Sequence, residues 1–210
     1  YRRHIMSTLK VDAIRHNSAT SDAITTASDG TCTAKLTSIG GGGLSHRNII
    51  VNGAMTVAQR GTSAAATGGY KTVDRYETAT GGVDEAPTQS QADISSGTTP
   101  YTLGFRKSLK VQNGNQTSGV SATDNIIALR YKAEAQDIAN SGWNYTSTSS
   151  FITFSFWIKS SVAQSFQGVL TTDDGTKQIY PFETGSLSAD TWTKITKIVP
   201  GNSNLQFDNN

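Results

Sequence analysis

The chain has 210 residues, of which 16% are charged and 35% are hydrophobic, and its formal net charge at pH 7 is +2. This near-balance argues against nucleic acid as the main partner, because binding phosphates requires a clustered excess of Lys and Arg. No apolar run approaches the length of a membrane span, so we predict no membrane insertion. Cys32 is the single cysteine and can form no internal disulfide. Abundant Ser, Thr and Gly favour short strands joined by polar turns.

Residues 1–39 are predicted to form an extended, β-rich docking segment. Residues 1–5 precede Met6, which has the character of a natural start, and we assign no function to them. Short strands are expected over 8–14, 23–26 and 31–37, with Asp29-Gly30 as the turn between the last two. Apolar residues are too few here to close a core. The segment therefore pairs with copies of itself or with a larger assembly, and disorder is the alternative.

Residues 40–47 are expected to be a linker, because they begin with four consecutive glycines, Gly40 to Gly43. A phosphate-binding loop is the competing interpretation. Such a loop needs a preceding apolar strand, a Lys-Ser/Thr pair and a following helix. Leu44-Ser45-His46-Arg47 provides none of these features, so we reject that interpretation.

Residues 48–210 are predicted to form an all-β domain. The clearest strand is 149–161, where Ile152, Phe154, Phe156 and Ile158 fall on one face. The other expected elements are strands at 107–112, 125–133, 165–172, 176–182 and 192–199, a strand or bent edge at 70–78, a short apolar run at 48–51 closed by a turn at Asn52-Gly53, extended chain at 55–60, a helical turn at 134–140, and loops at 64–69 and 79–100. About eight strands at such spacings predict an antiparallel, jelly-roll-like β-sandwich. Since no closing strand precedes Asn210, the domain is expected to continue in a longer protein or to be completed by a neighbouring copy.

Residues capable of catalysis or metal binding are sparse. His4, His16 and His46 are too far apart for a metal site. Asp173-Asp174 precedes Gly175 and favours a turn, with calcium binding as the alternative. Asp74 and Arg75 are expected to form an ion pair or to cap backbone groups. Neither they nor Asp84-Glu85 is accompanied by a nucleophile, so we predict no enzyme activity, no cofactor and no metal.

Three aromatic residues are the candidate contacts for a glycan. Sugar sites combine aromatic rings, which stack on sugar faces, with amides that bind hydroxyl groups. Tyr101, Trp143 and Tyr145 lie in loop-like segments and suit this purpose. The alternative is that they close the ends of the sandwich as part of its core.

A series of short motifs connects the chain to a known family. Residues 48–62 read NIIVNGAMTVAQRGT, and Tyr70 and Asp74-Arg75-Tyr76 follow. This series resembles the opening of jelly-roll domains in bacteriophage tail fibre and virion structural proteins. The segments 128–131, 136–138, 154–160 and 189–195 match the same family in order, so that the resemblance spans about residues 48–200. Ala58 departs from the pattern, because an aromatic residue usually stands there. Residues 6–12 are similar to the amino ends of marine phage tail proteins.

The resemblance implies a β-sandwich, a homotrimeric fibre and a location in the virion. On this basis the chain is expected to be a structural part of a tail fibre. Its amino-terminal segment would contact tail adaptor or nozzle proteins, and its sandwich would project towards the host surface for adsorption. Two alternatives stay open: a carbohydrate-binding module that recognises a host-surface glycan, and an accessory domain of a polysaccharide-degrading enzyme.

Overall fold

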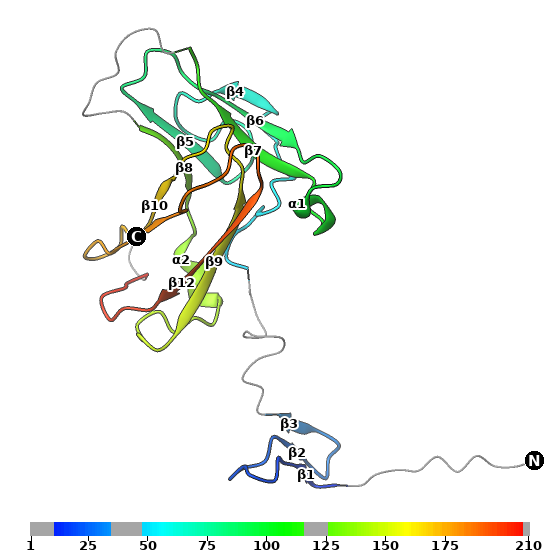
Figure 1. Cartoon of the computed structure of the whole chain (residues 1–210). Coiled ribbons are helices and arrows are strands. Elements are labelled where there is room, and N and C mark those ends of the chain that lie inside the picture. Colours follow the sequence, from blue (N-terminus) through cyan, green and yellow to red (C-terminus); the bar gives the residue numbers. More distant parts are fainter. Residues whose placement is uncertain (1–10, 35–47, 116–125, 208–210) are drawn as a thin grey trace, which may run out of the picture. The chain divides into compact units, whose positions relative to one another are not determined.

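The computed structural model describes residues 11–34, 48–115 and 126–207 (Figure 1). The chain divides into a first unit, residues 1–47, and a second unit, residues 48–210. Each unit is considered by itself below.

The first unit contains one small antiparallel sheet in the order β1-β2-β3. Its strands are β1 (Ala13–Ile14), β2 (Ile24–Thr26) and β3 (Cys32–Ala34). The predicted turn at Asp29-Gly30 is confirmed: Gly30 has a φ of 86°, and the Asp29 carboxylate accepts a hydrogen bond from the Thr31 backbone N–H at 2.9 Å. Residues 8–10 and 35–37, which were expected to extend two of these strands, lie outside the described residues.

The second unit confirms the all-β, antiparallel fold class. Its described elements are β4 (Ser63–Ala65), β5 (Tyr76–Gly81), β6 (Thr88–Asp93), α1 (Thr99–Thr102), β7 (Lys107–Gln112), β8 (Ile126–Tyr131), α2 (Ala135–Asn140), β9 (Phe151–Ile158), β10 (Gln167–Thr171), β11 (Ile179–Glu183) and β12 (Thr193–Pro200). Among the described residues they form one three-stranded sheet, β4-β6-β7, and three two-stranded sheets, β5-β8, β9-β12 and β10-β11.

The apolar residues that alternate along strand β9 pack against the β10-β11 hairpin. It pairs with β12 in the register Phe156↔Ile195 and runs beside it in Figure 1. On the face predicted to be buried, Phe154 and Phe156 contact the Phe182 ring of β11, with centroids 5.6 Å and 6.2 Å away. Ile195 of β12 is buried on the same face. The β10-β11 hairpin therefore packs over one face of the β9-β12 sheet.

Three sequence predictions in this unit are wrong. Residues 79–100 are not a loop, because β6 and the start of α1 lie there. Residues 63–65 form strand β4, although 64–69 was predicted to be a loop. Strand β6 reads Thr-Gln-Ser-Gln-Ala-Asp and carries no apolar alternation; pairing with β4 and β7 on either side makes it a strand. The turn predicted at Asn52-Gly53 is confirmed, since residues 51–54 form a turn and Asn52 has a φ of 57°. Residues 55–60, predicted to be extended, form no strand: Met55 has a φ of 56°, and a further turn lies at 59–60.

The core contains several polar side chains. Gln89 of β6 is fully buried, and Thr78 of β5 is 1% exposed. Tyr76 is buried beside Tyr131, with ring centroids 5.3 Å apart. Burial raises the pKa of Tyr76 to about 12, because the phenolate would lose its hydration.

Candidate functional site

The three predicted glycan contacts do not form one site. Tyr101 lies in α1, which Figure 1 places beside β7, whereas Trp143 and Tyr145 lie in the connection between α2 and β9. The Arg106 guanidinium covers one face of the Tyr101 ring at 3.9 Å from its centroid, and Arg106 Nη1 donates a hydrogen bond to the Tyr101 carbonyl at 2.7 Å. Arg106 thus occupies a ring face that a sugar would need.

Trp143 and Tyr145 form an aromatic cluster with Phe207, a residue that sequence reasoning did not select. The Tyr145 ring meets Phe207 edge-on, with centroids 4.9 Å apart, and Trp143 lies 6.3 Å from Tyr145. Trp143 Nε1 donates to the Ser150 carbonyl at 3.3 Å. All three rings are half-buried. They therefore belong partly to the packing of this end of the unit and partly to its surface.

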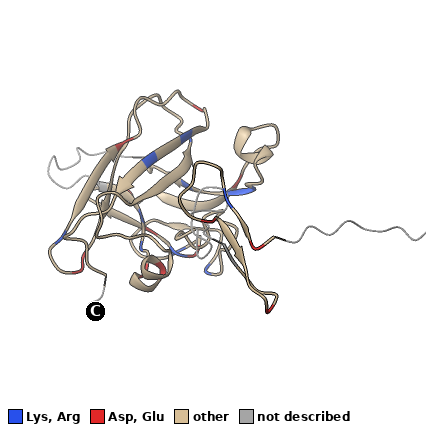
Figure 2. Ribbon diagram, turned by 90° about the horizontal axis from the view of Figure 1, so that it is seen from below, with Lys and Arg blue, Asp and Glu red and all other residues tan. Residues whose placement is uncertain are grey.

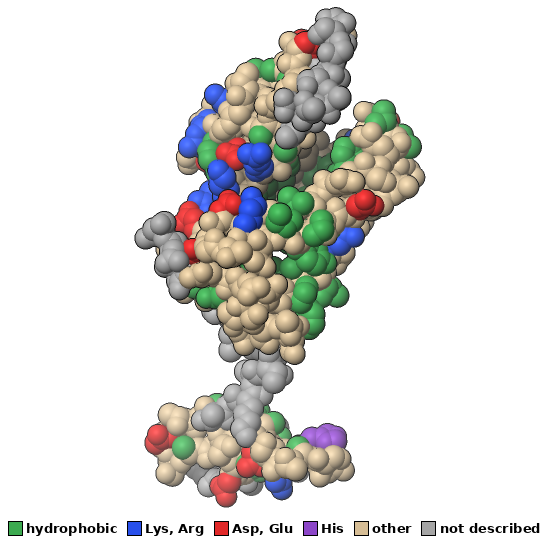
Figure 3. All heavy atoms as spheres, turned by 90° about the vertical axis from the view of Figure 1, so that its left-hand side faces the viewer, with side chains coloured by type: hydrophobic (Ala, Val, Ile, Leu, Met, Phe, Trp, Pro, Cys, Tyr) green, Lys and Arg blue, Asp and Glu red, His purple; other side chains and the backbone are tan. Residues whose placement is uncertain are grey.

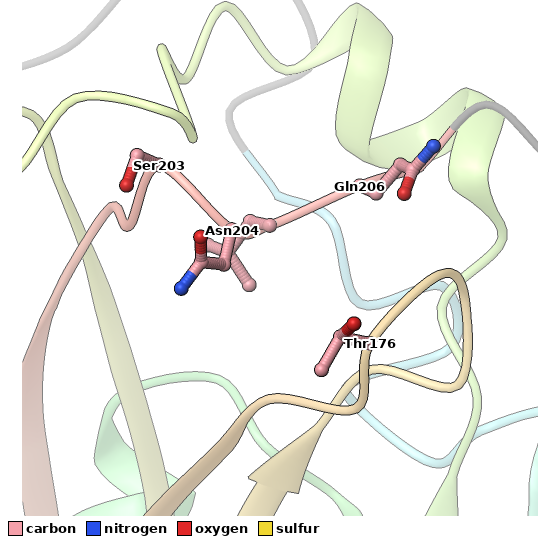
Figure 4. A pocket seen from close by; sticks show the side chains of 5 residues that line it. Thr176, Ser203, Asn204 and Gln206 are labelled. Carbon is pink, nitrogen blue, oxygen red and sulfur yellow. The ribbon is translucent and has the colours of Figure 1, made fainter.

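A pocket of about 480 Å³ is lined mainly by the residues that precede Phe207 in the sequence (Figure 4). Its lining residues are Thr176, Ser203, Asn204, Leu205 and Gln206. Ser203, Asn204 and Gln206 follow one another along the segment after β12, and Thr176 faces them from the β10-β11 connection. We call this the amide-lined pocket.

Close backbone contacts hold this segment in place. The Gly201 N–H donates to the Ser150 carbonyl at 2.8 Å, and the Asn202 N–H donates to the Tyr145 carbonyl at 2.8 Å. Both acceptors belong to the loop that carries the aromatic cluster. Residues 203–206 of the amide-lined pocket are thus fixed to the loop that carries Trp143 and Tyr145, which lies about 60 positions earlier in the sequence.

The lining of the amide-lined pocket is uncharged. Its hydroxyl and amide groups can donate and accept hydrogen bonds, and Leu205 adds an apolar contact. Such a lining suits a ligand with many hydroxyl groups and no charge.

A second pocket, of about 420 Å³, is lined mainly by charged side chains. Its residues are Gln59, Arg60, Tyr70, Asp74, Arg75, Lys132 and Glu134, and we call it the charged pocket. Figure 3 shows basic and acidic side chains gathered side by side on one face of the second unit, and Figure 2 shows that residues of both signs are spread over the ribbon.

Asp74 and Arg75 pair with other residues and not with each other. The Asp74 carboxylate accepts a hydrogen bond from the Gln59 N–H at 3.2 Å and lies 3.5 Å from Arg60. Arg75 Nη1 donates to Glu134 at 2.5 Å, and Arg75 Nη2 lies 3.8 Å from Asp137. The hydrogen bond from Arg75 holds the pKa of the Glu134 carboxyl below its usual range. The expected capping of a backbone group is confirmed for Asp74, which accepts from the Gln59 N–H, whereas the expected ion pair between Asp74 and Arg75 is replaced by pairs with other residues.

The residues considered for metal binding are not gathered into a site. In the described ranges no group of three or more His, Cys, Asp or Glu side chains lies close enough to hold an ion. Asp173 and Asp174 lie in the β10-β11 connection with Gly175 at a φ of 57°, as a turn requires, and Asp173 pairs with Lys177 at 3.3 Å. His4 and His46 lie outside the described residues.

Comparison with protein-family models, with curated proteins and with solved structures finds no match to this chain. Across the described residues, neither short helix nor any other helical segment has the length and apolarity needed to cross a bilayer.

Proposed function

We propose that the chain is a structural subunit of a bacteriophage tail fibre that assembles with copies of itself, as a homotrimer, in the virion. The motifs in residues 48–62, 74–76 and 154–160, which resemble the tail fibre family, support this proposal. In it, the first unit docks to tail adaptor or nozzle proteins, and the second unit completes a jelly-roll sandwich against neighbouring copies.

The observation that carries the proposal is the apolar surface of the two-stranded sheets. Phe151 and Ile198 lie on the face of β9-β12 that points away from the β10-β11 hairpin, and Val169 and Ile179 lie on the outer face of that hairpin. These four side chains are 57–62% exposed. Figure 3 shows apolar side chains gathered on one face of the unit. Open strand edges with exposed apolar residues favour association, and a second copy is the partner that a fibre supplies.

Light scattering at micromolar concentration tests the proposal. The intact protein is expected to have three times the 22.3 kDa mass of one chain. Val169→Lys with Ile179→Lys is expected to yield single chains, because two buried ammonium groups would oppose association. Leu103→Lys is the control, since Leu103 is 61% exposed but lies at the end of α1. A wild-type mass of one chain, or a double variant that keeps the trimer mass, would refute the proposal.

The amide-lined pocket favours a second function, recognition of a neutral saccharide of the host surface. Its uncharged lining and the adjacent Tyr145 and Phe207 rings support this function. With maltohexaose and cellohexaose as calorimetric probes, Tyr145→Ala and Asn204→Ala are each expected to weaken binding about tenfold, the loss of roughly one good contact. Tyr101→Ala is expected to leave binding unchanged. Absence of binding by the wild type, or equal losses in all three variants, would argue against this function.

A further inference from the structure

The charged pocket has a rigid framework. Arg75 occupies the left-handed region with a φ of 76°, which costs a non-glycine residue about 1–3 kcal/mol. Its guanidinium lies between Glu134 and Asp137 and so ties the turn before β5 to α2. The Asn52 side chain fixes the backbone of Asp74 by donating a hydrogen bond to its carbonyl at 3.0 Å. Arg75 is thus engaged by two carboxylates of the pocket's framework. The other two cations of the pocket are available to bind a ligand.

Arg60 and Lys132 are these remaining cations. Their side chains are 56% and 66% exposed. Arg60 lies 3.5 Å from Asp74, and Lys132 lies 3.3 Å from Glu77. Both distances exceed the 2.7–2.9 Å or so of a strong charge-assisted hydrogen bond, and exposed pairs of this kind contribute little to stability. An anionic ligand can therefore engage both cations at small cost.

The other groups of the pocket define the rest of the ligand. Tyr70 is 37% exposed, and the Arg60 guanidinium lies 6.0 Å from the centroid of its ring. An exposed ring of this kind can stack on the apolar face of a sugar. Glu134, whose side chain is 48% exposed, can accept hydrogen bonds from hydroxyl groups. The ligand that satisfies all of these groups carries one anion, several hydroxyls and a ring.

We propose that the charged pocket binds an acidic saccharide. The anion, a carboxylate, sulfate or phosphate ester, contacts Arg60 and Lys132, neighbouring hydroxyls donate to Glu134, and the sugar ring packs on Tyr70. Nucleic acid fits less well, because the Asp74 and Glu134 carboxylates would repel its closely repeated phosphates. The inference depends neither on trimer formation nor on the amide-lined pocket.

Calorimetry with four probes tests this inference: oligogalacturonate, a chondroitin sulfate hexasaccharide, maltohexaose and sodium sulfate. At least one acidic oligosaccharide is expected to bind, and the better of the two identifies the preferred anion. Its affinity should fall as salt is added, because the attraction is screened. Arg60→Gln and Lys132→Ala should each weaken it about 10- to 100-fold, the usual effect of losing a charged hydrogen bond.

The chain offers matched controls for both variants. Arg15 is 52% exposed and lies 3.7 Å from Asp22, and Lys177 is 59% exposed and lies 3.3 Å from Asp173. Arg15→Gln and Lys177→Ala are expected to leave affinity unchanged. Circular dichroism and the mass in solution show whether each variant keeps its fold and assembly, so that loss of the trimer is distinguished from loss of this site.

Four outcomes would overturn the inference. They are no binding of either acidic probe, equal affinity for maltohexaose at the charged pocket, binding of sodium sulfate as tight as that of the saccharides, and equal losses in the control variants. If Arg60→Gln does not fold, Lys132→Ala alone decides, because the ion pair of Lys132 is exposed and its removal is expected to be tolerated.

Discussion

Gly168→Ala is expected to lower the free energy of unfolding of the second unit by about 2–3 kcal/mol, near the upper end of the cost of overpacking. Gly168 of β10 lies directly opposite Phe182 of β11. The Phe182 ring lies across the glycine, so that a Cβ at residue 168 would come within 2.7 Å of its Cε2 atom. The same ring contacts Phe154 and Phe156. Any movement that relieves the overlap therefore disrupts the packing between the hairpin and β9.

Urea unfolding measures this effect, with Gly53→Ala as the matched control. A Cβ at residue 53 would lie 3.5 Å from its nearest neighbour, which is an ordinary contact. The double variant Gly168→Ala with Phe182→Ala should show a coupling between the two sites, because removing the ring removes the overlap. Strictly additive losses would contradict the proposed role of Phe182.

Gly201→Ala is expected to be at least as destabilising, at about 3 kcal/mol or more, for a different reason. A Cβ at residue 201 would lie 2.9 Å from the Tyr145 carbonyl carbon, and still closer to the Tyr145 and Ser147 carbonyl oxygens. These are backbone atoms, which cannot move away by a change of side-chain rotamer. The hydrogen bonds from Gly201 to Ser150 and from Asn202 to Tyr145 would have to break.

Urea unfolding and tryptophan fluorescence together measure this second effect. Since the Trp143 indole donates to the Ser150 carbonyl, its emission should shift to longer wavelength when the two segments separate. Adding Tyr145→Ala should bring no recovery, in contrast to the rescue expected at Gly168, because the obstructing atoms of residue 145 belong to its backbone. Recovery in that double variant would place the obstruction in the side chain and contradict this explanation.

Most strands could be predicted because their apolar residues alternate. Strands β7, β8, β9 and β12 were located within a few residues, as was the β10-β11 hairpin. Strand β6 could not be found in this way, since its register depends on β4 and β7, which only the folded chain brings beside it. Similarly, β5 begins at Tyr76 and not at Tyr70, because the left-handed turn at Arg75 precedes it.

The candidate sites were only partly predictable. Tyr145 was selected as an exposed aromatic residue, but Phe207 and the amides of residues 204 and 206 carry no local signal. They become neighbours of Tyr145 because Gly201 permits close backbone approach. In the charged pocket, Arg60 and Tyr70 belong to the family-like motifs, whereas Lys132 and Glu134 join them only through the position of β8 and α2.

The pairing of β9 with β12 has a consequence for how the chain is made. Phe151 pairs with Pro200 and Ile158 with Thr193, so the whole of β9 is synthesised, and emerges from the ribosome, ahead of its partner strand. At about 5–20 residues per second, this interval lasts a few seconds. Throughout it, a strand with three phenylalanines and a tryptophan has no neighbour from β12 to cover it. During synthesis, nascent chains can therefore contact chaperones, or one another on a polysome, through the uncovered apolar side chains of β9.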